Sequence, residues 1–498
     1  MRKNSKRTKR PLNGPPASGR EPSGKLTARD VIRSVEEFTA YTRQFVGVFD
    51  RREQQHWSVF YLCGQLANLT RKTIEPMVLG LYGPDTKAVR ALQHFIGQSL
   101  WSAEAMIVRC QQLVATWLGE SDGVVIVDGS GFPKQGADSV GVARQYCGHL
   151  GKVANCQEGV FLVYASRGGF TFLDERLYLP ERWFGDDHRQ RWQRCGIPDE
   201  VVFRPEPDLA LEMISGLARR AVVPFRWVTA DEHFGQNPAF LQGISALGKW
   251  YLAEMPADTR VWKRTPPVEP PGCGPLGRPR LRSRVAKTAP PPERVDLLAK
   301  ELPRSMWKRY TIKEGSKGPL LADFAFLRVA PVQQNLPGPR QWLVLRRNLA
   351  EPAETKFYLS NAPARCAPSQ LVRVSGLRWP VETALKEGKG EVGMDHCETR
   401  TWLGWHHHMA QTFMAHLFLT RLQLVFKKSP ALTIAQSRRL IAQAIQDDGE
   451  AIDIFALIDY RQWRNRAAYR SHRIALVPVL AGGDRRLKHA KSRSNTKS

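Results

Sequence analysis

The sequence lacks any apolar run approaching the roughly 18 residues that mark a membrane-spanning helix. Its most apolar helix-like segment, 409–426, is interrupted by Gln411, His416 and Arg421. The N-terminus is basic and has no apolar core of the kind that signal peptides carry. We therefore expect neither membrane insertion nor secretion, and we predict a cytoplasmic protein.

Closely spaced cysteine pairs are missing as well. The eight cysteines include no C-x-x-C pair, which is the spacing typical of zinc ribbons. Their scatter along the chain fits reduced thiols in a cytosolic protein. A zinc ribbon is therefore disfavoured.

Acidic residues are scarce relative to basic ones. Asp and Glu total 47 whereas Lys and Arg total 74, which gives a formal net charge of +27. A positive field of this size costs stability through self-repulsion, and a polyanionic partner offsets that cost. Because neutralising phosphates releases counterions, the charge favours a nucleic-acid partner. The alternative is a protein whose Arg-rich faces are merely solvated.

Apolar residues are plentiful, and the chain is long enough for several domains. They make up 42% of the 498 residues, with 9% aromatic, so the chain can bury a sizeable core. Helical periodicity dominates the first hundred residues, short β-branched runs alternate with helical patterns after Gly123, and Pro and Gly are dense from 256 to 300. We expect a basic disordered arm at 1–25, a helical region at 27–118, a mixed α/β core at 120–255, a Pro-rich and β-rich insertion at 256–360, a second core segment with C-terminal helices at 361–460, and a basic disordered tail at 484–498.

Three carboxylates stand out by their position. Asp128 follows the β-branched run 124–127, and Asp231 follows the short apolar run 227–230. Ligand sites of α/β sheets gather at such strand ends. Glu382 follows Pro380 at the start of a predicted helix, where proline is favoured. The alternative for either aspartate is a turn or cap residue that binds nearby backbone amides.

Three acids in a basic protein suit one kind of chemistry. A phosphodiester is shielded by negative oxygens, and two divalent cations can activate the attacking oxygen and stabilise the leaving one. Mg²⁺ prefers carboxylate oxygens as ligands. Converging acids in a cationic cleft are therefore typical of enzymes that cleave nucleic acids.

Four short segments carry a resemblance to a known family. They are 127–134 (VDGSGFPK), 139–148 (SVGVARQYCG), 230–235 (ADEHFG) and 378–382 (RWPVE), the last followed by Lys389. With them the chain resembles DDE-type insertion-sequence transposases of bacteria over roughly residues 30–430. The resemblance implies an RNase H-like catalytic core: an α/β (α+β) fold with a mixed sheet flanked by helices, a β-rich insertion before the catalytic glutamate, and an all-helical N-terminal domain. It also implies that Asp128, Asp231 and Glu382 form the catalytic and metal-binding triad.

A finer signature surrounds the glutamate. In this transposase group a Tyr, an Arg, the catalytic Glu and a Lys recur at fixed spacing, and Arg378, Glu382 and Lys389 fit that spacing. Ser375 stands at the tyrosine position, which is a departure. Residues at these intervals share a helical face, so we expect Arg378 and Lys389 to bind DNA phosphates beside the metals. The alternative is a surface ion pair between Arg378 and Glu382.

Further DNA contacts are expected close to the first aspartate and beside the glutamate. Lys134, Arg144 and Gln145 lie near Asp128 in sequence, and a structural role is an equal alternative for them. Trp379 is a candidate for stacking on an extruded base, although a tryptophan beside a proline is more often part of a core. The helical region 27–118 is a candidate DNA-binding domain, with ordinary helical packing as the alternative.

The resemblance implies a function in full. It implies a transposase that uses two Mg²⁺ ions, with Mn²⁺ able to substitute, to cleave the element's ends and join them to target DNA. Double-stranded DNA would be the partner, a homodimer would hold two ends, and the location would be the bacterial cytoplasm at the nucleoid. The alternatives are a nuclease-inactive DNA-binding regulator descended from a transposase, and an RNase H-like nuclease without strand transfer.

Overall fold

The computed structural model describes residues 28–272, 280–315, 318–349, 354–426 and 432–446. The arm expected at 1–25 and the tail expected at 484–498 lie outside the described residues, as does the end of the segment 361–460 beyond residue 446.

The first five α-helices form a helical region that ends at Leu118. Asp85 caps α4 by accepting hydrogen bonds from the backbone N–H groups of Lys87 and Ala88, and Ser102 caps α5 in the same way through Ala105. The helices are α1 (Ala28–Arg43), α2 (Arg52–Leu66), α3 (Ile74–Leu81), α4 (Thr86–Gly97) and α5 (Ala103–Leu118), with the short 3-10 helix η1 (Val46–Val48) between α1 and α2.

The core that follows alternates strands and helices. Its strands are β1 (Val124–Pro133), β2 (Ala143–Cys147), β3 (Lys152–Ser166), β4 (Gly169–Tyr178), β5 (Trp227–Ala230) and β6 (Trp250–Met255). Its helices are α6 (Arg189–Cys195), α7 (Glu206–Arg220), α8 (Glu232–Gly235) and α9 (Pro238–Ala246), with the 3-10 helices η2 (Gly148–Leu150), η3 (Glu181–Phe184) and η4 (Asp186–His188).

Strand β1 is the centre of this core. The side chains of Val124, Val125, Ile126 and Val127 are all buried, which explains why a β-branched run begins the strand. On one side β1 pairs antiparallel with β3, and on the other it pairs parallel with β5, which in turn pairs parallel with β6. The carboxyl ends of β1, β5 and β6 therefore meet at one edge region of the sheet.

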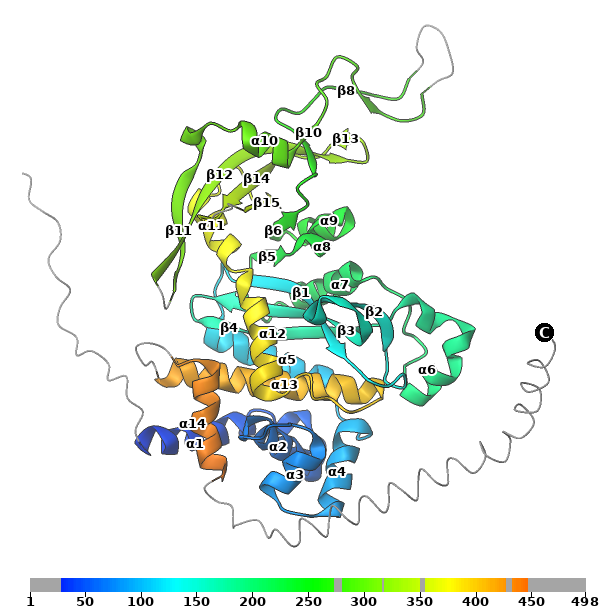
Figure 1. The fold of residues 1–498 in the computed structure, drawn as a ribbon, viewed down its shortest axis with the longest axis vertical. Coiled ribbons are helices and arrows are strands. Elements are labelled where there is room, and N and C mark those ends of the chain that lie inside the picture. The colour runs from blue at the N-terminus through cyan, green and yellow to red at the C-terminus, as the bar shows by residue number, and fades with distance from the viewer. Residues whose placement is uncertain (1–27, 273–279, 316–317, 350–353, 427–431, 447–498) are drawn as a thin grey trace, which may run out of the picture.

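The insertion continues the same sheet. Its last strand, β15, pairs antiparallel with β6, and the order then runs through β14 and β12 to β7 and β10. In Figure 1 these strands lie at the end of the molecule opposite α1–α4. The elements are β7 (Arg260–Trp262), β8 (Val268–Glu269), β9 (Arg284–Val285), β10 (Glu293–Arg294), α10 (Val295–Glu301), η5 (Arg304–Met306), β11 (Lys308–Gly315), β12 (Gly318–Gln333), β13 (Leu336–Pro337), β14 (Gln341–Arg347) and β15 (Thr355–Ser360).

The last helices return from the insertion to the core and the helical region. They are α11 (Pro368–Gly376), α12 (Trp379–Val392), α13 (Trp402–Phe426) and α14 (Ile434–Gln446). Helix α12 packs against β1 and β3, while α13 packs against α5 and β4 and contacts α2 and α4 (Figure 1). Most side chains of α13 are buried, including His407 and His408. The hydroxyl of Tyr61 lies 2.7 Å from Nδ1 of His408, which ties α2 to α13.

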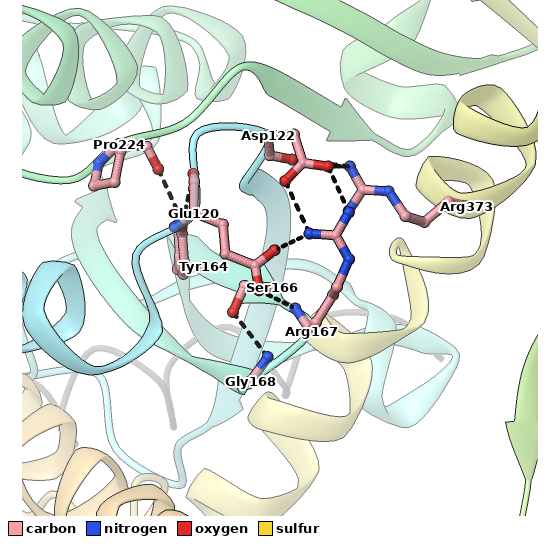
Figure 2. A network of polar contacts seen from close by, with 8 residues as sticks. All are labelled: Glu120, Asp122, Tyr164, Ser166, Arg167, Gly168, Pro224 and Arg373. Atoms are coloured by element: carbon pink, nitrogen blue, oxygen red, sulfur yellow. Dashed lines mark hydrogen bonds and ion pairs between the residues drawn. The ribbon is translucent and has the colours of Figure 1, made fainter. Parts of the chain in front are cut away.

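A polar network anchors the exit from the insertion to the start of β1 (Figure 2). Arg373 of α11 donates to the backbone carbonyl of Asp122 and pairs with its carboxylate, both at 2.9 Å. Arg167, in the turn between β3 and β4, bridges the carboxylates of Asp122 and Glu120. Tyr164 hydrogen-bonds to the backbone around the same loop. Because α12 follows α11 after two residues, this network helps to set where α12 begins.

The expected fold class is confirmed. A large mixed sheet is flanked by helices and joined to a helical region, as in an RNase H-like α+β fold. Among the described helices, none is long and apolar enough to cross a membrane. The division into separate domains stays a prediction.

Candidate active site

Three acids follow the last paired residues of the parallel strands. Asp128 was expected at the end of a strand, but β1 continues to Pro133 through its pairing with β3, and only its parallel pairing with β5 ends at Val127. The register pairs Val127 of β1 with Ala230 of β5, and Ala230 with Ala253 of β6. The next residue along the chain after each of these is acidic: Asp128 within β1, Asp231 at the start of α8 and Glu254 within β6. Neighbouring positions in parallel strands share a face of the sheet. The sheet itself thus brings Asp128 and Asp231 together and adds Glu254 beside them.

Glu382 reaches this row from α12. It lies in the first turn of the helix, where Pro380 occupies one of the first two positions, as proline at a helix start does. Arg378, the residue before the helix, donates from Nη1 to Oε1 of Glu382 at 2.7 Å. Its Nη2 lies 3.8 Å from Oδ2 of Asp231, and its Nε lies 3.5 Å from Oε2 of Glu254. One guanidinium therefore stands among acids from β5, β6 and α12.

The electrostatics show that the acids act on one another. Burial, together with the charges of Asp231 and Glu382, raises the pKa of Asp128 to about 7, although Arg378 opposes the shift. Burial acts against ionisation of Arg378, yet the surrounding carboxylates raise its pKa. Asp231 also caps α8 by accepting from the backbone N–H of Phe234 at 3.2 Å. The cap interpretation therefore holds for Asp231, and its role in a metal site stays a prediction.

A cleft of about 870 Å³ opens beside Asp128 and Glu382. The strand segment Gly129–Gly131 carries almost no side-chain bulk along this wall, and a Cβ at Gly131 would lie 2.9 Å from Oε2 of Glu158. Lys389 lines the same cleft and donates from Nζ to the carbonyl of Gly131 at 2.8 Å. Burial lowers the pKa of the Lys389 ammonium. The cleft thus combines acids from the sheet with a lysine from α12.

A second cavity of about 220 Å³ also borders Glu382 and is lined by residues of β12, β14 and β15. Arg378, Trp379 and Ser375 line it as well. The indole of Trp379 is 57% exposed, so it is not a core residue. Ser375 is buried and donates to the carbonyl of Val372, so it presents no aromatic ring here. Base stacking by Trp379 stays a prediction.

The remaining sequence-predicted contacts are distributed differently. Lys134 donates from Nζ to the carbonyl of Cys397 at 2.6 Å, so its ammonium already holds the loop before α13. Gln145 uses its amide group within the β2–β3 pair, donating to Cys156. Arg144 is exposed on β2. Their contacts with DNA stay predictions, and Arg144 is the one of the three whose side chain lies at the surface.

Sequence reasoning missed four residues near the acids. Glu254 lies in β6, and an acid in an otherwise apolar strand is a signal that the sequence does display. Burial, together with the charge of Glu206, raises the pKa of Glu158 to about 8. His233 lies 3.2 Å from Glu206, and this hydrogen bond raises the pKa of the imidazole. Glu158 interacts electrostatically with Asp128 and with Glu206 and His233, whereas Glu254 lies beside Arg378.

The donor set has the chemistry that a hard divalent cation requires. Carboxylate oxygens converge, and one oxygen of Glu254 is buried without a hydrogen-bond partner. Within the described residues, however, no group of three His, Cys, Asp or Glu side chains is arranged tightly enough to hold a metal ion. The guanidinium of Arg378 lies among these acids, in contact with Glu382 and within 4 Å of Asp231 and Glu254. The residues therefore fit a metal in donor type but are not gathered around one point.

Comparison with known proteins adds two similarities. A family model described as DDE superfamily endonuclease matches residues 44–319, more than half of the chain. That range includes Asp128 and Asp231 and ends before Glu382. The chain is also 25% identical over 336 residues to the "Probable transposase for insertion sequence element IS701" of Microchaete diplosiphon, which covers 66% of this chain and 73% of that protein.

Proposed function

Since the chain belongs to the DDE superfamily of endonucleases, we propose that it is the transposase of an insertion sequence, cleaving the element's ends and joining them to target DNA. The observation that carries the proposal is the row of acids. Asp128 and Asp231 follow Val127 and Ala230, which pair in neighbouring parallel strands, and Glu382 of α12 contacts the Arg378 guanidinium that also lies near Asp231. A single aspartate after a strand can be explained as a turn or cap residue. That explanation does not account for acids from three separate elements near one site.

Asp128, Asp231 and Glu382 would hold two Mg²⁺ ions, with Mn²⁺ able to substitute. When bound, the cations would activate the attacking oxygen and stabilise the leaving oxygen of the phosphodiester. The raised pKa of Asp128 supports this role, because an acid cluster that repels itself gains most from a divalent cation. Mutual repulsion thus favours metal binding.

Arg378 and Lys389 would position the DNA backbone. Both belong to the α12 segment, on which Glu382 lies between them, and both line cavities that also contain Glu382. A guanidinium can bind phosphate with two parallel hydrogen bonds, which fixes the orientation of the scissile strand. Arg144, Lys134, Gln145 and Trp379 are proposed as further DNA contacts, with Trp379 stacking on an unpaired base in the smaller cavity.

The partner would be double-stranded DNA, both the element's ends and the target. The net charge of +27 supports a DNA partner. A homodimer in the complex with two ends, DNA binding by the helical region, and a cytoplasmic location at the nucleoid complete the proposal.

The test is a joining assay. Purified protein, Mg²⁺, DNA carrying the element's ends and a supercoiled target should give target-joined products. Asp128→Asn, Asp231→Asn and Glu382→Gln should each reduce product by at least about a thousandfold, as loss of a group acting on the transition state does. Cleavage without joining would favour a nuclease, and DNA binding with neither reaction would favour a regulator.

A further inference from the structure

Glu254 is the acid of this cluster to which the proposed function gives no role. It lies on β6 beside Asp231, and its side chain is 13% exposed. Lys356 of β15 takes one of its oxygens, Oε1, at 2.8 Å. The other, Oε2, is buried and has no hydrogen-bond partner. A buried carboxylate oxygen of this kind costs free energy unless something binds it.

Arg378 carries a potential hydrogen-bond donor for Oε2 of Glu254. Its Nε is likewise buried without a hydrogen-bond partner and lies 3.5 Å from Oε2 of Glu254, too far for a good hydrogen bond. The same guanidinium is engaged at 2.7 Å with Glu382 instead. Two facing groups are therefore left unsatisfied across a gap that a shift of less than about one ångström would close.

Divalent cations and the present position of Arg378 compete. The guanidinium occupies an oxygen of Glu382 and faces Asp231, the two acids that the proposed function assigns to metal binding together with Asp128. A cation bound to those acids would repel Arg378. Glu254, on the next strand, offers the guanidinium of Arg378 a carboxylate partner, so the guanidinium need not move into solvent.

We propose that Glu254 is a positioning residue that receives the guanidinium of Arg378 when divalent cations take Asp231 and Glu382. In this arrangement Arg378 stays beside the metals, where it can meet a DNA phosphate. The proposal rests on the proposed function, because it assumes that these acids bind metal. It assigns to Glu254 no contact with DNA.

The proposal is tested by Mn²⁺ binding to the full chain without DNA, followed by electron paramagnetic resonance at constant pH and ionic strength. Arg378→Met should tighten Mn²⁺ binding about tenfold, because it removes a competing charge. Glu254→Gln should weaken binding at least about fivefold when Arg378 is present and less than about twofold in the Arg378→Met background, since contacting residues couple.

The matched control is Glu206→Gln. It removes a negative charge near Asp128 that is paired with His233 rather than with Arg378. Its effect on Mn²⁺ binding should be the same in both Arg378 backgrounds. If Glu254→Gln fails to fold in urea-unfolding measurements, Glu254→Asp replaces it. That variant keeps the charge but withdraws the carboxylate, and it should weaken binding only when Arg378 is present.

The outcomes separate two failures. Equal weakening by Glu254→Gln in both backgrounds would overturn the positioning role of Glu254 and leave the proposed metal site standing. If the parent protein binds no Mn²⁺, or if Asp128→Asn removes none of the Mn²⁺ binding, the proposed metal site is wrong and this inference fails with it.

Discussion

Replacing Asp128 by asparagine should make the metal-free protein more stable. Burial and neighbouring acids raise the pKa of Asp128 from 3.8 to about 7. At 1.36 kcal/mol per pKa unit, a shift of about three units corresponds to about 4 kcal/mol of destabilisation when the group is ionised. The asparagine side chain would keep the contact that Oδ1 of Asp128 makes with the backbone N–H of Gly129 at 3.0 Å. Allowing for relaxation in the cluster, we expect a gain of about 2–4 kcal/mol.

The stability gain of Asp128→Asn should depend on pH. A carboxyl whose folded pKa is raised imposes no penalty below its unfolded pKa, near 4, and imposes the full penalty above its folded pKa, near 7. The stability difference between Asp128→Asn and the parent should therefore be close to zero at pH 4 and largest at about pH 8. Excess Mg²⁺ should stabilise the parent and not the variant, because binding to the folded state adds free energy by mass action.

Urea unfolding at several pH values, followed by tryptophan fluorescence, measures this difference. The control is Asp187→Asn at an exposed position in η4, which should change stability by less than about 0.5 kcal/mol at every pH. A variant that is no more stable than the parent at pH 8, or a gain that is equal at pH 4 and pH 8, would refute the account of Asp128 as an acid held in a self-repelling cluster.

Three further changes test other parts of the structure. Arg373→Met should cost about 1–3 kcal/mol in urea unfolding because it removes half-buried bonds to Asp122. Arg167→Ala in the same network should cost less because that side chain is exposed, and equal costs would contradict this ranking. Gly131→Ala should lower the free energy of unfolding by about 1–3 kcal/mol in urea, because its Cβ would lie 2.7 Å from Sγ of Cys147. An unchanged unfolding midpoint would show that the cleft wall has room for a methyl group. Trp379→Ala should leave stability unchanged, because the side chain is exposed. It should weaken binding of a DNA end about tenfold in fluorescence anisotropy if one base stacks on the indole. Unchanged affinity would show that Trp379 is not a DNA contact.

The two aspartates could be predicted from the sequence because local signals mark them. The buried run 124–127 identifies a strand, and Asp128 follows it; the run 227–230 and Asp231 repeat the pattern. Such signals depend only on neighbouring residues. The helix starts after Asp85 and Ser102 belong to the same class, because capping is local chemistry.

The features that could not be predicted depend on which strands pair. Glu254 becomes notable only when β6 is placed beside β5 in a register that sets Ala253 next to Ala230. In the same way, an insertion was expected at 256–360, but not that β15 would pair with β6 and extend the core sheet. Partner and register arise from packing between distant segments, which a single sequence does not display.

Sequence proximity also misled in one respect. Lys134 lies six residues after Asp128, yet its ammonium is bound to the carbonyl of Cys397. Arg378, far away in sequence, stands among the acids. The path of the chain, rather than distance along it, determines which cations reach the cluster.

Anomalous diffraction from crystals soaked in Mn²⁺ tests the assignment of Asp128, Asp231 and Glu382 most directly. We predict manganese peaks within coordination distance of all three carboxylates, with the guanidinium of Arg378 displaced from Glu382. Manganese bound elsewhere with these carboxylates left uncoordinated, or an Arg378–Glu382 pair unchanged in fully soaked crystals, would contradict it.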